Sequence, residues 1–137
     1  LTALSIIEDG RLALAHHDNL IVNDRVAYDD AATGPASDLA EGYRLADALG
    51  DRTVLVMANH GVLVVGPTIH DAFHELTVVE QACGVQLQAL STGMKLRNQP
   101  DHLRWNHRGV WSEQVDGRLF LDAWRRILDR EEPDYRS

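Results

Sequence analysis

The 137-residue sequence lacks most features that mark secreted, membrane or nucleic-acid-binding proteins. It has a single cysteine, Cys83, so no internal disulfide can form, which fits a reducing cytoplasm. No apolar run approaches the ~20 residues of a membrane helix, and no signal peptide is recognisable. The net charge of -8 disfavours phosphate binding, and the arginines of the C-terminal part alternate with acids. We therefore expect a cytoplasmic protein that binds neither nucleic acid nor membrane.

The composition is that of an ordinary globular domain, with 45% hydrophobic and 25% charged residues. A chain of this length usually forms one domain and buries a core without disulfides. No linker or repeat divides the sequence, so we treat residues 1–137 as a single domain. The sequence begins at Leu1 rather than Met, directly in an apolar stretch, which suggests that the polypeptide starts further upstream.

The most informative stretch is residues 53–66, TVLVMANHGVLVVG. Two short apolar runs flank Ala58-Asn59-His60-Gly61, which predicts two buried strands joined by a turn. Neutral imidazole is a good ligand for zinc and similar divalent ions, so His60 is a candidate metal ligand. One histidine is not a site, because catalytic zinc usually has about three protein ligands. The alternative for His60 is a hydrogen-bonded structural histidine at the turn.

Helix signals lie on both sides of this hairpin. Asp38 and Glu41 have the spacing of a capping box, which predicts a helix that ends at Gly50. Thr68 is a good N-cap for a longer helix over residues 69–91. The residues at the spacing of its apolar face are Ile69, Phe73, Leu76, Val79 or Glu80, Cys83, Leu87 and Leu90. A further helix is expected over residues 119–130. Strands that alternate with helices indicate an α/β layered domain.

The remaining segments give weaker signals. Residues 1–8 look like the end of a helix, with Gly10 in a left-handed position after it. Residues 20–22 and 25–28 look extended around a turn at residues 23–24. Pro100 and Asp101 are expected to start another helical turn, and residues from Trp111 onward are expected to be helical.

The other histidines and carboxylates offer less specific sites. His70 and His74 share a helix face but lie in no HExxH context. His16 and His17 are adjacent, and either one of them faces a site shared with His60 or both lie in a polar loop. Glu80 on the apolar face of the long helix would need a partner or a raised pKa, and a structural hydrogen bond is the favoured interpretation. We expect His102 and His107 to be solvated.

The stretch from Leu1 to about Gly93 resembles the class II aldolase/adducin family. The most specific part is residues 57–90, MANHGVLVVGPTIHDAFHELTVVEQACGVQLQAL. The family pattern of strand, His-Gly, strand, Gly and helix is matched by His60, Gly61, Gly66, Ala72, Glu80, Ala82 and Gln86. The resemblance covers about two thirds of the chain.

The resemblance implies a three-layer α/β/α sandwich with a central mixed sheet. Members of the family commonly form tetramers with active sites at subunit interfaces. The resemblance also implies a divalent metal, Zn2+ in the first place and Mn2+ or Co2+ as alternatives, bound by three histidines. His60 matches the third ligand, while the other two, in a His-x-His motif, and the acid/base Glu are expected upstream of Leu1. The chain would then be the C-terminal portion of such a domain.

The implied function is that of a metal-dependent carbon–carbon lyase, an aldolase or a related decarboxylase. It would act on a small hydroxy- or oxo-acid or a sugar-type substrate through a metal-stabilised enolate. His17 lies near the position where some sugar-phosphate aldolases of the family place a catalytic tyrosine. Tyr135 would play the part of the tail tyrosine that they send to a neighbouring subunit, although the motif around it, EEPDYRS, is weak. The alternative is a non-catalytic, adducin-head-like assembly module or an inactive truncated fragment.

Overall fold

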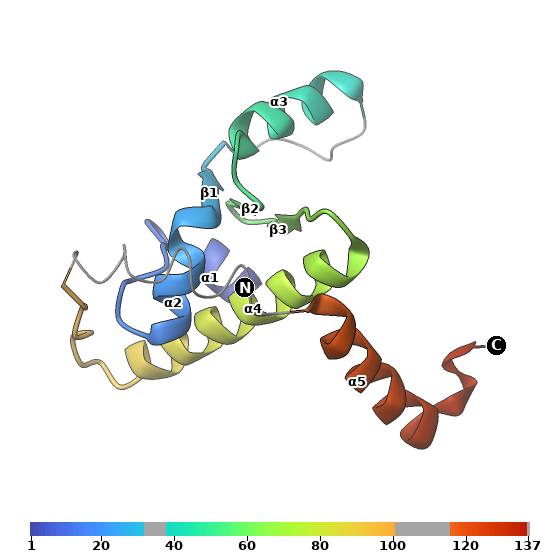
Figure 1. Ribbon diagram of the computed structural model, residues 1–137. Coiled ribbons are helices and arrows are strands. Elements are labelled where there is room, and N and C mark those ends of the chain that lie inside the picture. Colours follow the sequence, from blue (N-terminus) through green and yellow to red (C-terminus); the bar gives the residue numbers. More distant parts are fainter. Residues whose placement is uncertain (32–37, 101–115, 137) are drawn as a thin grey trace.

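The computed structural model describes residues 1–31, 38–100 and 116–136. Within these ranges one mixed sheet with strand order β1-β2-β3 forms the centre of the fold (Figure 1). Strand β1 (Val26–Asp29) runs parallel to β2 (Val54–Met57), and β2 pairs antiparallel with β3 (Gly61–Val64). The expected α/β fold with a mixed sheet is confirmed.

The β2–β3 hairpin has the register that the sequence predicts, with Val54 opposite Val64 and Met57 opposite Gly61. Successive side chains of a strand point to opposite faces of the sheet. Val54 and Val56 are buried in the main core cluster, whereas Leu55 is buried outside that cluster. Strand β2 is therefore covered on both faces, and its apolar run reflects that position at the centre of the sheet.

Helix α4 (Ile69–Leu90) crosses one face of the sheet, and helix α3 (Leu39–Leu49) lies on the other side (Figure 1). Both helices begin as predicted, because the side chains of Thr68 and Asp38 accept hydrogen bonds from the amides of Asp71 and Glu41. The core lies between the sheet and α4, where the following residues are buried: Leu1, Leu4, Leu12, Val22, Val26, Val54, Val56, Val79, Ala82 and Cys83.

The apolar face predicted for α4 is buried at Val79 and Cys83, which are both 0% exposed, but it is exposed at Ile69, Leu76 and Leu90. Ile69 is 73% exposed, and the Glu80 side chain is 62% exposed, with Oε2 2.7 Å from the Leu1 amino nitrogen. The buried carboxylate is that of Glu75, which lies 2.6 Å from Arg25 Nη1. Gln86 is also buried. Polar side chains can occupy the inner face of a helix when they find partners there, and a hydrophobicity pattern does not register this.

The segment before β1 corrects two further expectations. Residues 17–22 form helix α2 (His17–Val22), although a strand was expected at 20–22, and a short 3-10 helix, η1 (Asn23–Arg25), leads into β1. The β-branched residues suggested a strand, but packing of α2 against α4 decides the outcome. After helix α1 (Thr2–Ser5), Asp9 takes the left-handed conformation with φ 54°, and Gly10 does not.

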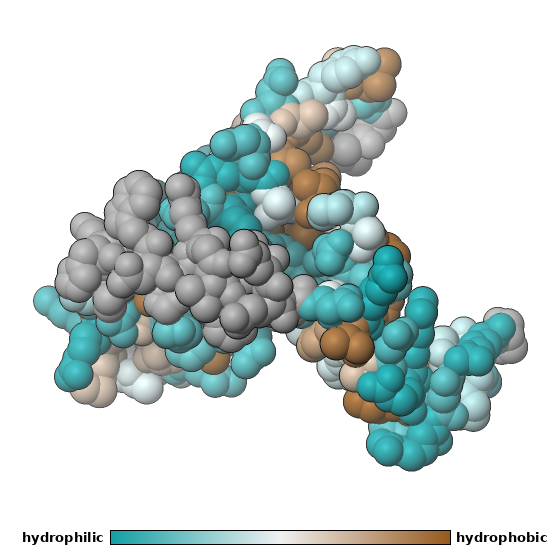
Figure 2. Space-filling model, in the orientation of Figure 1, coloured by the Kyte–Doolittle hydropathy of each residue, from teal (hydrophilic) through white to brown (hydrophobic). Residues whose placement is uncertain are grey.

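Helix α5 (Gly117–Glu131) begins beside the N-terminal end of α4 and leads away from the sheet to a 3-10 turn, η3 (Pro133–Arg136) (Figure 1). The Phe120 ring packs on α4, with its centroid 5.9 Å from that of Phe73 and 5.1 Å from that of His74. Apolar side chains surface near this junction (Figure 2), and Leu119 and Trp124 of α5 are exposed. His102, His107 and most of the helical segments expected from Asp101 and from Trp111 lie outside the described residues.

The Cys83 thiol lies in the core, and burial raises its pKa to about 11. The thiolate is the reactive form, so we expect Cys83 to react with a thiol reagent at pH 8 only when the chain unfolds. The measurement is the labelling rate with and without urea. A rate in the native protein close to the rate in urea would contradict the burial of this side chain.

No helix in the described ranges has the length and the apolar character that a membrane span requires.

Candidate functional site

The turn between β2 and β3 holds His60 in a defined backbone geometry. The His60 amide donates to the Met57 carbonyl at 3.1 Å, which closes the turn. Asn59 has φ 59° and Gly61 has φ 142°. Asn tolerates the left-handed region better than most residues, and Gly reaches conformations that side chains exclude. The sequence Asn-His-Gly therefore specifies this turn on both sides of the imidazole.

Two other elements hold the turn from outside the hairpin. The Ala58 amide donates to the Asp29 carbonyl at the end of β1, at 2.8 Å, and the Asn59 amide donates to the Ser5 carbonyl at the end of α1, at 3.0 Å. A Cβ placed on Gly61 would lie 3.8 Å from Thr2 Oγ1. The first residues of the chain therefore lie directly beside the His60-Gly61 backbone.

His60 is exposed on this turn, so its imidazole is accessible to a ligand. Among the described residues, no group of three His, Cys, Asp or Glu side chains is placed to hold a metal ion. The turn itself offers one imidazole, and the described residues do not by themselves fit a zinc site, which needs about three protein ligands. The role of His60 as a metal ligand therefore stays a prediction.

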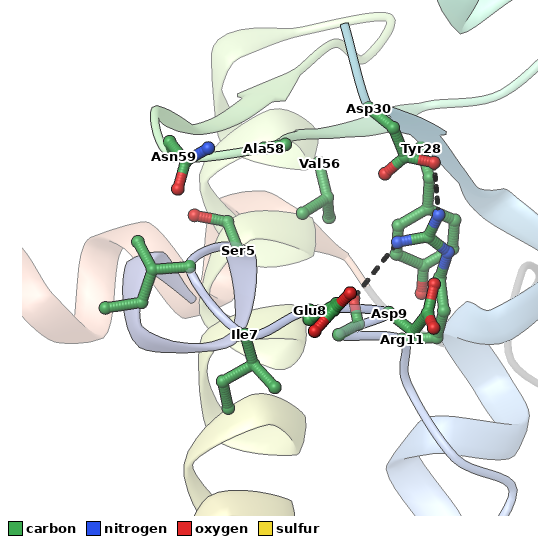
Figure 3. A pocket seen from close by; sticks show the side chains of 12 residues that line it. Ser5, Ile7, Glu8, Asp9, Arg11, Tyr28, Asp30, Val56, Ala58 and Asn59 are labelled. Carbon is green, nitrogen blue, oxygen red and sulfur yellow. Dashed lines mark hydrogen bonds and ion pairs between the residues drawn. The ribbon is translucent and has the colours of Figure 1, made fainter. Parts of the chain in front are cut away.

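A cavity of about 440 Å³ opens beside the turn. Figure 3 shows Ala58 and Asn59 on one side of it and Ser5 on the other. Its lining comes from three segments that are distant in the sequence: residues 5–11, Tyr28 with Asp30, and Val56 with Ala58 and Asn59. A volume in the range of about 300–1,000 Å³ is typical of small-molecule sites.

The polar wall of this cavity is a contact between Arg11, Tyr28 and Asp30. The Arg11 guanidinium lies 4.3 Å from the Tyr28 ring centroid, and its Nη2 is 2.5 Å from Asp30 Oδ2 (Figure 3). The Tyr28 hydroxyl accepts a hydrogen bond from the Leu12 amide at 3.0 Å, and burial raises the pKa of Tyr28. The phenol is therefore neutral at physiological pH. Sequence reasoning missed these three residues, because the pairing of β1 with β2 brings Tyr28 and Asp30 to the hairpin and contacts with these two residues bring Arg11 there.

The sequence-predicted residues lie on separate elements. His17 is exposed at the first position of α2. Tyr135 lies in η3, where its hydroxyl donates to Asp129 Oδ1 at 2.9 Å and accepts from Arg136 Nε at 3.0 Å. Neither His17 nor Tyr135 lines the cavity beside the turn. Their roles in a common site with His60 stay predictions.

The histidine pair on α4 has a structural setting. The His74 ring packs edge-on against Phe120, and His70 Nδ1 is buried with no hydrogen-bond partner in the described part of the chain. The two belong to no metal-binding cluster among the described residues.

Asp29 links the end of β1 to helix α3 and makes the hairpin region sensitive to pH. Its carboxylate is buried and contacts the Arg44 guanidinium at 2.7 and 3.0 Å, and hydrogen bonding to Arg44 lowers the pKa of Asp29. A lowered folded-state pKa stabilises the fold at pH values above the unfolded value of about 3.9, and this stabilisation is lost as the pH falls through the folded value.

We therefore expect Arg44→Met to lower the urea midpoint at pH 7, and the difference from the unmodified protein to shrink below about pH 4. Arg130→Met, which removes an exposed pair with Glu131, serves as the control and should have little effect at either pH. A difference for Arg44→Met that grows as the pH falls would contradict the role of Asp29.

The comparisons with known proteins agree with this fold. Residues 1–87 match the family model described as Class II Aldolase and Adducin N-terminal domain. A provisionally named aldolase class 2 protein of Caulobacter vibrioides is 33% identical over 138 residues, which cover 97% of this chain and 52% of that protein. Human beta-adducin is 33% identical over 97 residues, 70% of this chain and 13% of that protein.

The fold is also found in a solved structure. The crystal structure of an aldolase II superfamily protein from Pseudomonas syringae superposes with a TM-score of 0.81 at 32% identity. The match covers 99% of this chain and 54% of that one. The chain thus spans about half the length of the bacterial relatives. On the extent of the family match and of the identities, the chain belongs to the class II aldolase and adducin family.

Proposed function

We propose that the chain is part of a metal-dependent carbon–carbon lyase, an aldolase or a related decarboxylase. The substrate class that we propose is a small hydroxy- or oxo-acid or a sugar-type molecule. The observation that carries the proposal is the His60 turn, which presents an accessible imidazole between two backbone positions fixed by Asn59 and Gly61. Family membership and the class 2 aldolase name of the Caulobacter relative support it.

In this proposal His60 is one of three imidazole ligands of a divalent ion. We propose Zn2+, with Mn2+ or Co2+ as alternatives that imidazole also binds. The other two histidines would come from residues that precede Leu1, and the position of Thr2 beside Gly61 supports this source. A divalent ion held there would supply Lewis-acid chemistry to oxygen atoms of the substrate.

The remaining proposed roles concern proton transfer and assembly. Imidazole can donate or accept a proton near neutral pH, and we propose this role for His17. Tyr135, in the η3 turn that comes after α5, is proposed to act at the site of a neighbouring subunit in a cytoplasmic homotetramer. The cavity beside the turn, with its Arg11–Asp30 pair, would hold polar groups close to the hairpin.

His60→Ala in the full-length protein is expected to lower metal affinity by more than about a hundredfold. Mutation of residues that only hydrogen-bond to a metal ligand already lowers affinity about tenfold to a hundredfold, and the loss of a ligand should cost more. The measurement is metal content after dialysis against a weak chelator. His17→Gln is the matched control, which should keep the metal and lose turnover. Unchanged metal content in His60→Ala would remove His60 from the ligand set.

Residues 1–137 alone are expected to be inactive, because the described residues supply a single ligand. The measurement is a retro-aldol or decarboxylase assay with added Zn2+, Mn2+ or Co2+. Turnover by this isolated chain would contradict the proposal that the site depends on upstream residues.

The second candidate is a non-catalytic assembly module of the adducin-head type. The 33% identity to human beta-adducin favours it, and so do the exposed apolar side chains Leu119 and Trp124 on α5. Metal analysis separates the two candidates, because an assembly module needs no metal and would bind none stoichiometrically. A His-x-His sequence immediately before Leu1 would favour the lyase.

A further inference from the structure

Helix α3 carries an exposed apolar row on its outer side. Leu39 is 73% exposed, Tyr43 is 64% exposed, and Ala46 is also exposed. These residues follow one another at intervals of four and three, so they lie on one side of the helix. Figure 2 shows apolar atoms at the surface of α3. A row of this kind at the surface of a protein is typical of a contact with another protein.

The edge of this row is acidic. Asp47 lies four residues after Tyr43, so it is the next residue along the same side of α3, and it is exposed. It makes no ion pair and no hydrogen bond with the described residues. The one cation of α3 is Arg44, which pairs with Asp29 and Glu41. The charge of Asp47 is therefore available to a partner.

Helix α5 has an apolar row that extends beyond its contact with α4. Leu119, Ala123 and Ile127 follow one another at intervals of four, and Trp124 lies three residues before Ile127 on the neighbouring side. Leu119 is 70% exposed and Trp124 is 43% exposed. Phe120 packs on α4 near the start of α5, and the rest of the helix leads away from the sheet (Figure 1).

The edge of the row on α5 is basic. Arg126 lies three residues after Ala123, and Arg130 lies three residues after Ile127, so both border the row on the side away from Trp124. Arg126 is exposed and has no partner among the described residues. The two helices therefore present the same kind of apolar row with edges of opposite charge.

We propose that α5 of one copy packs against α3 of a second copy of this chain. The apolar rows face each other, and Arg126 of one copy lies against Asp47 of the other. Figure 1 shows the two helices far apart in one copy, so the contact joins two copies. It is a head-to-tail contact, because each copy offers both surfaces, and such contacts form a ring when the rotation closes. The proposal names the surfaces that join the subunits of the proposed homotetramer, and it rests on that part of the proposed function.

Charge reversal in the full-length protein tests the contact. Arg126→Asp alone or Asp47→Arg alone places like charges against each other, so we expect each variant to raise the dissociation constant of the assembly by at least about tenfold. An equimolar mixture of the two single variants should assemble like the unmodified protein, because every contact between unlike copies again joins opposite charges. The measurement is molar mass by sedimentation over a range of protein concentrations.

Arg97→Asp is the matched control, because Arg97 is exposed, has no partner among the described residues and lies on neither helix. It should leave the assembly unchanged. A loss in Arg126→Asp that is absent in Asp47→Arg, or a mixture that stays dissociated, would show that α5 does not dock on α3. The dissociation constant of the unmodified protein should also rise between about 0.05 and 0.5 M NaCl, and a constant value would contradict the charge pair.

The outcomes separate this contact from the rest of the proposed function. An unmodified protein that is monomeric would overturn the homotetramer and the contact together. A stable assembly that is insensitive to both charge reversals would overturn the contact alone. Metal content should not differ between the two variants and the unmodified protein, because the proposed contact uses no residue of the β2–β3 turn.

Discussion

Arg25→Met is expected to lower the free energy of unfolding by about 2–3 kcal/mol. Arg25 Nη1 lies 2.6 Å from Glu75 Oε2, and the Glu75 side chain is only 11% exposed. Without the guanidinium, Glu75 keeps one hydrogen bond, from Thr53 Oγ1 at 3.2 Å, and its charge is buried without a counter-ion. Loss of one partner from a fully buried pair costs about 3–5 kcal/mol, and Arg25 is 37% exposed, which reduces the cost.

Two comparisons make this prediction specific to the buried carboxylate. Arg125→Met breaks an exposed pair with Asp122 and should cost less than about 1 kcal/mol. Arg25→Met combined with Glu75→Met removes both charges and should recover most of the lost stability. Urea unfolding of the unmodified protein, the two single variants and the double variant measures each change in the free energy of unfolding. A double variant as unstable as Arg25→Met would show that the cost comes from lost packing of the arginine side chain.

The elements that the sequence predicts well are those whose signals are local. The hairpin at residues 53–66 combines two apolar runs with an Asn-His-Gly turn, and both the pairing and the positive φ of Gly61 follow from those residues. Thr68 and Asp38 mark helix starts because a cap acts on amides only two or three positions away. The position of His60 on an accessible turn could therefore be anticipated.

What could not be predicted depends on partners that are distant in the sequence. Glu75 can be buried because Arg25 pairs with its carboxylate, whereas Glu80 has no contact with Arg25 among the described residues and is exposed. Arg25 is 50 positions from Glu75 in the sequence, so no local pattern indicates this pair. The strand expected at residues 20–22 is a helix because α4 offers it a surface. The cavity beside the turn joins Arg11, Tyr28 and Asn59 through strand pairing, and the periodicity of any one segment does not indicate it.

Gly10→Ala is expected to cost about 3 kcal/mol, at the upper end of the range for overpacking. A Cβ on Gly10 would lie 2.2 Å from the Leu4 carbonyl oxygen and 2.8 Å from that of Ile7. Both oxygens belong to the backbone, so relief requires movement of the segment that contains α1. Because the Ser5 carbonyl accepts from the Asn59 amide, this movement would also release the His60 turn. We expect faster hydrogen exchange at the Asn59 amide in addition to the lower urea midpoint.

Gly42→Ala provides the matched control on α3, where a Cβ would meet no atom within 4 Å. Ala is favoured over Gly inside a helix, so this variant should be more stable by about 0.5–1 kcal/mol, and exchange at Asn59 should not change. Both substitutions add one methyl group, so the opposite changes expected in stability come from the surroundings of that group, which are crowded at Gly10 and open at Gly42. If Gly10→Ala and Gly42→Ala had the same effect, the close approach of Gly10 to α1 would be wrong. If Gly10→Ala lowered stability but left Asn59 exchange unchanged, α1 would not hold the His60 turn in place.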